Sequence, residues 1–238
     1  MSVLDLFAPA RCVSCLERGG MPWCDRCRRD VEWLWDRRTC PRCASPADVH
    51  QCWPTSVPIR TTVALARYTG PVANGVVAGK VRGATAVWAT FGRWLAMRVD
   101  ACNIDVAAAV PTDRARARSR GHDHADLLAR AVALHLGRPH RRLLRPIGRL
   151  PDRGRASGGL PVPAPSFAAR TRLDGARVLL LDDVLTTGTT MAAAAVALVQ
   201  GGAGEVHAAV VGRAGVNISA ALKPGLLPHR HDGGSHVR

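Results

Sequence analysis

The chain has 238 residues, enough for one well-packed domain and a small second module, and it carries a net charge of +15. This charge favours anionic partners, either nucleic acids or polyphosphate compounds. No apolar stretch reaches the ~20 residues of a membrane span, and Met1–Phe7 lacks the basic start of a secretion signal. The sequence therefore argues against membrane insertion and predicts a cytoplasmic protein.

Composition divides the chain into three parts. Residues 1–56 are rich in cysteine, tryptophan and arginine, whereas residues 57–215 alternate β-prone apolar runs with alanine-rich helical stretches. Residues 216–238 end in a polar run of histidine, arginine and glycine, which is typical of disorder. We therefore predict a Cys-rich module, one larger domain and a disordered tail.

Four cysteines of the first part have the spacing of a zinc site. They form two Cys-x-x-Cys pairs, each able to present two thiolates from a tight turn, and two such pairs complete a closed tetrahedral site. In a reducing compartment this spacing indicates metal ligands rather than disulfides. A region this small also has too few apolar residues to fold without the metal. The predicted ligands are Cys12, Cys15, Cys24 and Cys27.

A third pair, Cys40 and Cys43, is followed by His50 and Cys52. A second site with three cysteines and one histidine is one alternative. We favour a single zinc ion, with these three cysteines as spare or alternative ligands and His50 as a loop residue.

Tryptophans share this region with many arginines, at Trp23, Trp33, Trp35 and Trp53. Aromatic and basic side chains together can stack on and neutralise single-stranded nucleic acid. The interpretation we prefer is that these tryptophans pack around the zinc module and against the larger domain.

The larger domain alternates strands and helices, which favours a parallel sheet covered by helices. A turn at Gly70-Pro71 separates the first strand from the first helix. Strands are predicted over Thr62–Tyr68, Val106–Val110, Val178–Leu181 and Val206–Val211, and helices over Val72–Lys80, Thr85–Arg98, Asp123–Leu136 and Met191–Gln200.

A basic loop follows the second predicted strand, with arginines at alternate positions: Arg114, Arg116, Arg118 and Arg120. Such a run by itself is usually a solvated loop or a nucleic-acid patch. At the carboxyl end of a strand, guanidinium groups can instead hold phosphate oxygens in pairs.

The most informative segment runs from Val178 to Thr190. Asp182 and Asp183 follow a fully apolar strand, at the end where open α/β sheets bind ligands. A small-residue loop then leads into a helix, whose free N–H groups favour phosphate: Thr186, Thr187, Gly188, Thr189 and Thr190. One helix cap needs one such residue, and this segment holds more than a cap requires. Two carboxylates can accept hydrogen bonds from the two hydroxyls of a ribose.

This segment closely resembles the phosphoribosyl-diphosphate (PRPP) motif of type I phosphoribosyltransferases. Together with the cysteine pairs, Lys80-Val-Arg-Gly83 and the arginine loop, it resembles the ComF family, with a zinc module before a phosphoribosyltransferase-like α/β domain. The resemblance implies that Asp182 and Asp183 hold ribose hydroxyls and that the Thr186–Thr190 loop wraps the terminal phosphate. It further implies Mg²⁺ with PRPP, and diphosphate contacts from Lys80, Arg114, Arg116 and Arg118.

Two functions follow from the resemblance. One is transfer of a phosphoribosyl group to an unidentified acceptor with release of diphosphate. The other is non-catalytic handling of single-stranded DNA during natural transformation. Two segments depart from the family pattern: the stretch 152–166 and Gly121-His-Asp-His124. The resemblance to type I phosphoribosyltransferases implies that a flexible segment at 152–166 closes over the substrate. This departure bears on turnover more than on ligand binding.

Overall fold

The computed structural model describes residues 11–35, 37–46, 50, 52–112, 122–147 and 166–215. The arginine loop with Arg114, Arg116 and Arg118, the departing stretch up to residue 165, and the predicted tail at 216–238 lie outside the described residues.

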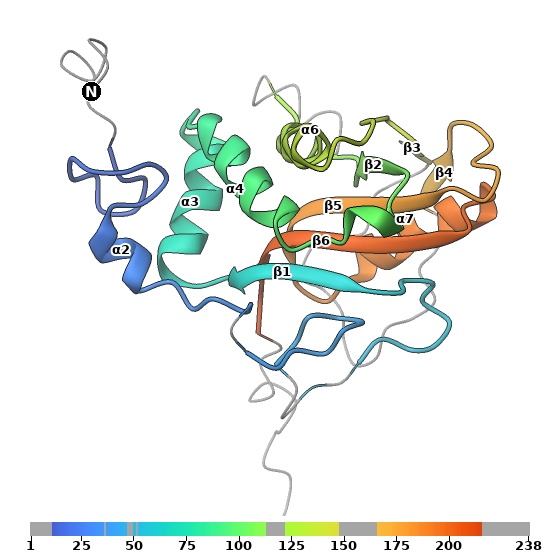
Figure 1. The fold of residues 1–238 in the computed structure, drawn as a ribbon, viewed down its shortest axis with the longest axis horizontal. Coiled ribbons are helices and arrows are strands. Elements are labelled where there is room, and N and C mark those ends of the chain that lie inside the picture. The colour runs from blue at the N-terminus through green and yellow to red at the C-terminus, as the bar shows by residue number, and fades with distance from the viewer. Residues whose placement is uncertain are drawn as a thin grey trace, which may run out of the picture.

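Four parallel strands form the central sheet, in the order β1-β6-β5-β2 (Figure 1). This confirms the four predicted strands, because each apolar run lies in one of them. The strands are β1 (Thr62–Arg67), β2 (Val106–Ala109), β5 (Arg177–Leu185) and β6 (Glu205–Arg213). Strand β5 is longer than the predicted Val178–Leu181, since its pairing with β6 continues to Leu185. Asp182 and Asp183 therefore lie within β5 rather than beyond its end.

Helices cover both faces of the sheet. Leu179 and Leu181 pack with α3 (Gly70–Val81), α4 (Ala86–Ala96) and α6 (His124–Leu136). The alternate residues Val178 and Leu180 point to the opposite face and pack with α7 (Thr189–Gln200), as the period of a strand requires. Among the described residues, no helix is long and apolar enough to cross a membrane.

The start of α3 corrects one prediction. Gly70 and Pro71 form the first turn of the helix instead of a separate turn before it. Proline fits this position because its missing N–H would have no helical partner there.

Two short helical elements and one hairpin escaped the sequence analysis. The hairpin pairs β3 (Leu144–Pro146) with β4 (Phe167–Ala169), and each strand is too short to show a periodic pattern. The others are α2 (Asp25–Arg29) and the 3-10 turn η1 (Ala101–Asn103).

The Cys-rich segment wraps around the β1 edge of the sheet (Figure 1). Trp33 bridges Ala66 in antiparallel fashion, and the Leu34 N–H donates to the Leu65 carbonyl oxygen over 2.9 Å. This pairing covers an edge that would otherwise expose free backbone groups. Residues up to Val31, together with Trp33 and Trp35, join the core on the α3 side, whereas Leu34 and the residues from Cys40 onward join the core on the α7 side.

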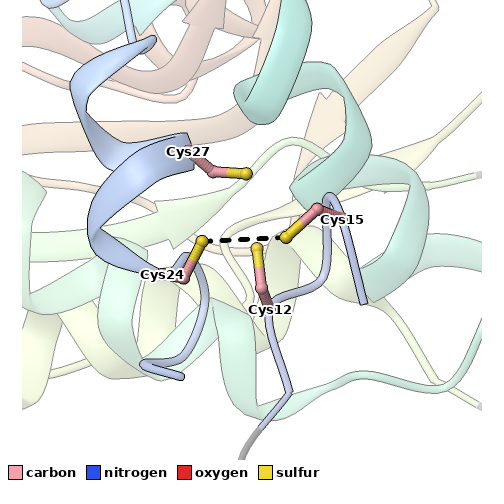
Figure 2. Close-up of side chains that lie close together, drawn as sticks. All are labelled: Cys12, Cys15, Cys24 and Cys27. Atoms are coloured by element: carbon pink, nitrogen blue, oxygen red, sulfur yellow. Dashed lines mark hydrogen bonds between the residues drawn. The ribbon is translucent and has the colours of Figure 1, made fainter. Parts of the chain in front are cut away.

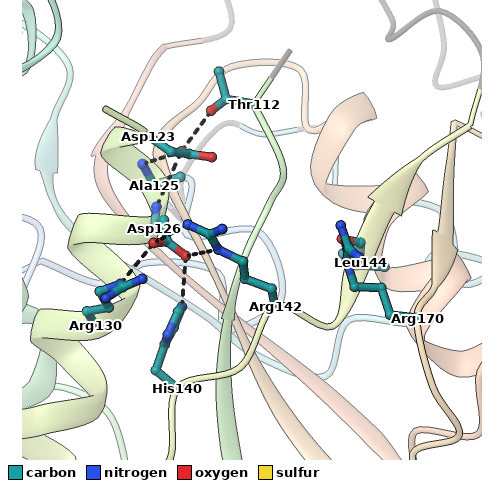
Figure 3. A network of polar contacts seen from close by, with 9 residues as sticks. All are labelled: Thr112, Asp123, Ala125, Asp126, Arg130, His140, Arg142, Leu144 and Arg170. Atoms are coloured by element: carbon teal, nitrogen blue, oxygen red, sulfur yellow. Dashed lines mark hydrogen bonds and ion pairs between the residues drawn. The ribbon is translucent and has the colours of Figure 1, made fainter. Parts of the chain in front are cut away.

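Asp126 lies at the centre of a network of polar contacts in the first turn of α6 (Figure 3). The helix begins after Asp123, whose carboxylate caps it by accepting from the Ala125 N–H over 3.1 Å. One turn later Asp126 accepts hydrogen bonds from Arg130 over 2.9 Å and Arg142 over 3.1 Å. Its carboxyl is buried, which acts to raise its pKa, but the two arginines outweigh burial and lower that pKa.

We expect Asp126→Asn to cost about 1–2 kcal/mol of unfolding free energy at pH 7, because it removes charged hydrogen bonds. A lowered pKa in the folded state stabilises the protein above the unfolded value of about 3.9, and this contribution is lost as the pH falls further. Urea unfolding of both proteins should therefore show a difference at pH 7 that narrows below about pH 4. Asp174→Asn is the control, since Asp174 and its partner Arg172 are exposed. Equal losses for the two variants would contradict the prediction.

Candidate functional site

A cavity of about 170 Å³ opens where β5 ends and α7 begins. Its wall combines an acidic strand end, a hydroxyl-rich loop and one lysine from α3. The lining residues are Tyr68, Lys80, Asp182, Val184, Leu185, Thr186, Thr187, Gly188, Thr189, Thr190 and Met191.

The loop before α7 presents backbone N–H groups. Gly188 precedes the helix with φ 84 and ψ 0 and, as a glycine, has no side chain that could cap the helix N–H groups. The Thr187 hydroxyl lies 3.1 Å from that of Thr189 and 3.5 Å from the Thr189 backbone nitrogen. The first N–H groups of any helix have no partner within the helix, and the helix dipole adds positive potential there. This end of the cavity suits an anion.

The two carboxylates have different surroundings. Asp183 is completely buried, forms an ion pair with Lys80, and has His124 Nε2 at 3.6 Å from its Oδ1. Asp182 accepts the backbone N–H of Asp183 on Oδ1 over 2.9 Å and lines the cavity. Because the Lys80 charge lies beside Asp183, the acidic pair is partly neutralised before any ligand binds.

Close packing of α3 on α4 brings Lys80 to the cavity. A Cβ on Gly79 would lie 2.7 Å from the Trp88 ring, so only glycine allows this approach. His122 Nε2 donates to the Gly79 carbonyl oxygen over 3.0 Å, which ties the end of α3 to the segment before α6.

The sequence analysis missed His124 and Tyr68. His124 is fully buried, and its ring centroid lies 5.7 Å from that of Trp88. Its ring nitrogen and the carboxylates of Asp182 and Asp183 lie within 4.8 Å of one another. The departure Gly121-His-Asp-His124 was the only signal for His124, and no pattern indicated Tyr68.

The predicted site residues therefore separate into two groups. The cavity brings together Lys80, Asp182 and the Thr186–Thr190 loop, with Asp183 beside them through Lys80. The three arginines at 114, 116 and 118 cannot be placed, because they lie outside the described residues.

Gly188 is expected to be the least replaceable residue of the loop. Besides its positive φ, a Cβ there would lie 2.5 Å from Trp53 Nε1. We expect Gly188→Ala to destabilise the protein by about 2–4 kcal/mol, from left-handed strain plus the clash. Gly137→Ala is the matched control, with φ 63 and nothing within 4 Å of the new Cβ, and should cost only about 1 kcal/mol. If urea unfolding shows equal losses of unfolding free energy for the two variants, the clash with Trp53 contributes nothing to the destabilisation.

The first cysteine cluster fits zinc (Figure 2). The sulfur atoms of Cys12, Cys15, Cys24 and Cys27 all lie within 4.8 Å of one another, and those of Cys15 and Cys24 are 3.7 Å apart. Ligands at the usual Zn–S distance stand about 3.8 Å apart at the corners of a tetrahedron, whereas a disulfide requires about 2.05 Å. The arrangement is that of a metal site.

A second cluster forms from Cys40, Cys43, His50 and Cys52, whose ligand atoms also lie within 4.8 Å of one another. The Cys40 and Cys52 sulfur atoms are 3.6 Å apart, again close to a tetrahedral edge. Gathering His50 with the three cysteines favours the alternative of two zinc sites over the single site that we preferred from the sequence.

Burial and neighbouring backbone groups shift the pKa values of the thiols within each cluster in different directions. Burial acts to raise the pKa of Cys12, but nearby backbone hydrogen bonds outweigh it and lower that pKa to about 6. In the same way the pKa of Cys40 falls to about 7. Burial raises the pKa of Cys27 to about 12. The Cys27 thiol can therefore be a thiolate at neutral pH only with a cation beside it.

Two family models match separate parts of the chain. The model of the double zinc ribbon domain matches residues 3–58, and that of the phosphoribosyl transferase domain matches residues 127–220. A search of curated proteins found none that matches the chain.

A search of solved structures also found matches. Glutamine PRPP amidotransferase from B. subtilis, complexed with ADP and GMP, is 22% identical with a TM-score of 0.37 over 52% of this chain and 25% of that one. Purine phosphoribosyltransferase from Pyrococcus horikoshii Ot3 is 17% identical with a TM-score of 0.36, over 53% and 83%. Adenine phosphoribosyl transferase from Trypanosoma brucei is 16% identical with a TM-score of 0.36, over 68% and 77%.

At these TM-scores the likeness supports no conclusion about function, and the chain spans only a quarter of the amidotransferase. The fold assignment comes from the sheet, the cysteine clusters and the two family models. The chain combines a type I phosphoribosyltransferase-like parallel sheet, with flanking helices, and an N-terminal Cys-rich zinc ribbon region.

Proposed function

We propose that the protein binds PRPP and transfers its phosphoribosyl group to an acceptor, releasing diphosphate. The observation that carries the proposal is one cavity lined by Asp182, the Thr186–Thr190 loop and Lys80. An acceptor-only carboxylate, an anion-binding helix start and a cation in one place match the three parts of PRPP: diol, 5-phosphate and diphosphate.

In the proposed pose the 5-phosphate lies against the Thr186–Thr190 loop. The ribose hydroxyls donate to Asp182 and Asp183, and the diphosphate lies toward Lys80 and the arginines Arg114, Arg116 and Arg118. Lys80 then has two roles, because it neutralises Asp183 before binding and attracts the diphosphate on binding.

The reaction breaks the bond between ribose C1 and the diphosphate oxygen, which leaves with the bonding electrons. The acceptor's nucleophilic atom forms the new bond to C1, and positive charge develops on the ring meanwhile. The two carboxylates favour that charge, and the cations favour the leaving diphosphate. The carboxylates of Asp182 and Asp183 fit Mg²⁺, a hard cation bound through one or two carboxylates plus phosphate oxygens. When bound, it would supply further charge neutralisation at the diphosphate.

Calorimetric titration of the zinc-loaded protein tests the proposal. We expect PRPP with Mg²⁺ to bind more tightly than ribose 5-phosphate or diphosphate, because only PRPP reaches all three parts of the site. Tighter binding of diphosphate than of PRPP would argue for a general anion patch. No binding of PRPP to the folded protein would contradict the proposal.

Single-stranded DNA handling is a second candidate, favoured by one aromatic pair. Trp33 and Trp35 stack with ring centroids 3.8 Å apart, both are only partly buried, and Arg98 donates to the Trp35 carbonyl oxygen. Aromatic faces beside cations can stack on bases. Fluorescence anisotropy with a labelled oligothymidylate should show salt-sensitive binding that Trp35→Ala weakens. Equal binding by both proteins would remove this surface from consideration.

A further inference from the structure

We infer that the second cysteine cluster, Cys40, Cys43, His50 and Cys52, holds the Thr186–Thr190 loop in its binding conformation, so that metal there and a phosphoribosyl ligand in the cavity bind cooperatively. The inference rests on the proposed function for the identity of the ligand. It assigns Arg213 and Trp53 as the positioning residues between the two sites.

Arg213, the last residue of β6, joins the cluster to the loop. Its Nε donates to the Cys43 carbonyl oxygen over 3.0 Å, and one terminal nitrogen donates to the Ser45 hydroxyl over 2.9 Å. The other terminal nitrogen donates to the carbonyl oxygens of Leu185 over 3.0 Å and Thr186 over 2.6 Å. A single planar guanidinium thus fixes the backbone of a metal-ligand turn and of the loop at once.

The charge of Arg213 matters because the side chain is almost completely buried, 4% exposed. Its hydrogen-bond partners among the described residues are neutral oxygens. Three thiolates, one neutral imidazole and Zn²⁺ carry a net charge of about −1, which complements the guanidinium. Metal loss would remove that compensation, and a phosphate bound on the loop would gain from the positive charge behind it.

Trp53 supplies a second link. It follows the ligand Cys52 directly and is buried, with its indole against Gly188. The indole therefore supports the residue that directly precedes α7, and any shift of Cys52 on metal loss would move this support.

The first cluster has no such link among the described residues. It packs against α3 instead, where Asn74 donates to the Ser14 hydroxyl over 2.9 Å and Trp23 Nε1 donates to the Pro71 carbonyl oxygen over 2.8 Å. The two clusters thus provide matched variants: Cys52→Ser removes a ligand beside the loop, and Cys15→Ser removes one far from it.

Two measurements test the coupling with PRPP and Mg²⁺ as the probe. In calorimetry we expect Cys52→Ser and Arg213→Lys to weaken PRPP binding about tenfold or more, and Cys15→Ser to change it less than about threefold. By reciprocity, PRPP should raise the affinity for one of two zinc ions, measured at equilibrium against a competing chelator, in the wild type, and Arg213→Lys should abolish this gain while still binding two ions.

A third measurement needs no ligand. Amide hydrogen exchange at residues 186–191 should be faster in Cys52→Ser than in Cys15→Ser. If the wild type binds PRPP but Cys52→Ser and Arg213→Lys bind it equally well, the coupling is refuted and the proposed function stands. If the wild type does not bind PRPP, the proposed function fails, and the exchange comparison alone decides whether the cluster holds the loop.

Discussion

The double replacement Asp182→Asn with Asp183→Asn is expected to weaken PRPP binding at least ~100-fold. Each charged hydrogen bond from a ribose hydroxyl contributes about 1.5–3 kcal/mol, and an amide can replace neither the charge nor the second acceptor. Asp182 lines the cavity and Asp183 lies beside it through Lys80, so both changes act at one place. Calorimetry with Mg²⁺ and PRPP measures the effect.

Controls separate lost recognition from lost folding. Asp183 is buried and pairs with Lys80, so Asp183→Asn alone removes one member of a buried ion pair. Lys80→Met combined with Asp183→Asn removes both charges and should restore thermal stability without restoring PRPP binding. Asp182→Asn alone should fold normally and lose at least about tenfold in affinity. Wild-type affinity for PRPP in the folded Asp182→Asn/Asp183→Asn variant would falsify the assignment of the diol site.

Removal of zinc is expected to have the largest effect on stability. Structural zinc sites contribute apparent free energies of about 10–16 kcal/mol in small zinc-binding peptides. Here the clusters also anchor core residues, since Cys12 packs with the α3 side of the sheet and Cys43 with the α7 side. A strong chelator should therefore lower the unfolding midpoint by more than about 10 °C and expose apolar surface.

Metal analysis during chelation distinguishes one ion from two. Two zinc ions per chain, lost in separate steps, would fit the two clusters. A midpoint that does not change after complete zinc removal would mean that the aromatic packing around Trp23 suffices to hold the module.

Local patterns predicted the sheet and the loop that leads into α7 because their signals lie in contiguous residues. The apolar run Val178–Leu181, the acidic pair and the Thr-Gly loop each occupy a few consecutive positions. The limits of β5 were wrong because Asp182 and Asp183 continue the ladder to β6, which depends on pairing and not on hydropathy.

Contacts across long separations could not be predicted in the same way. Arg213 reaches Cys43 across 170 positions, and His124 reaches Asp183 only because α6 packs on the sheet. His50 was treated as a loop residue, since nothing in the sequence shows which turn brings it to the cysteines. Such partners are set by tertiary packing, and the periodicity and spacing of residues in the sequence carry no information about it.

A crystal structure of the zinc-loaded protein with PRPP and Mg²⁺ tests the central claim most directly. The account predicts the 5-phosphate on the backbone N–H groups of Thr186–Thr190, the ribose hydroxyls within hydrogen-bond distance of Asp182 or Asp183, and the diphosphate toward Lys80. PRPP bound elsewhere, or a cavity that stays free of PRPP at saturating concentration, would contradict it.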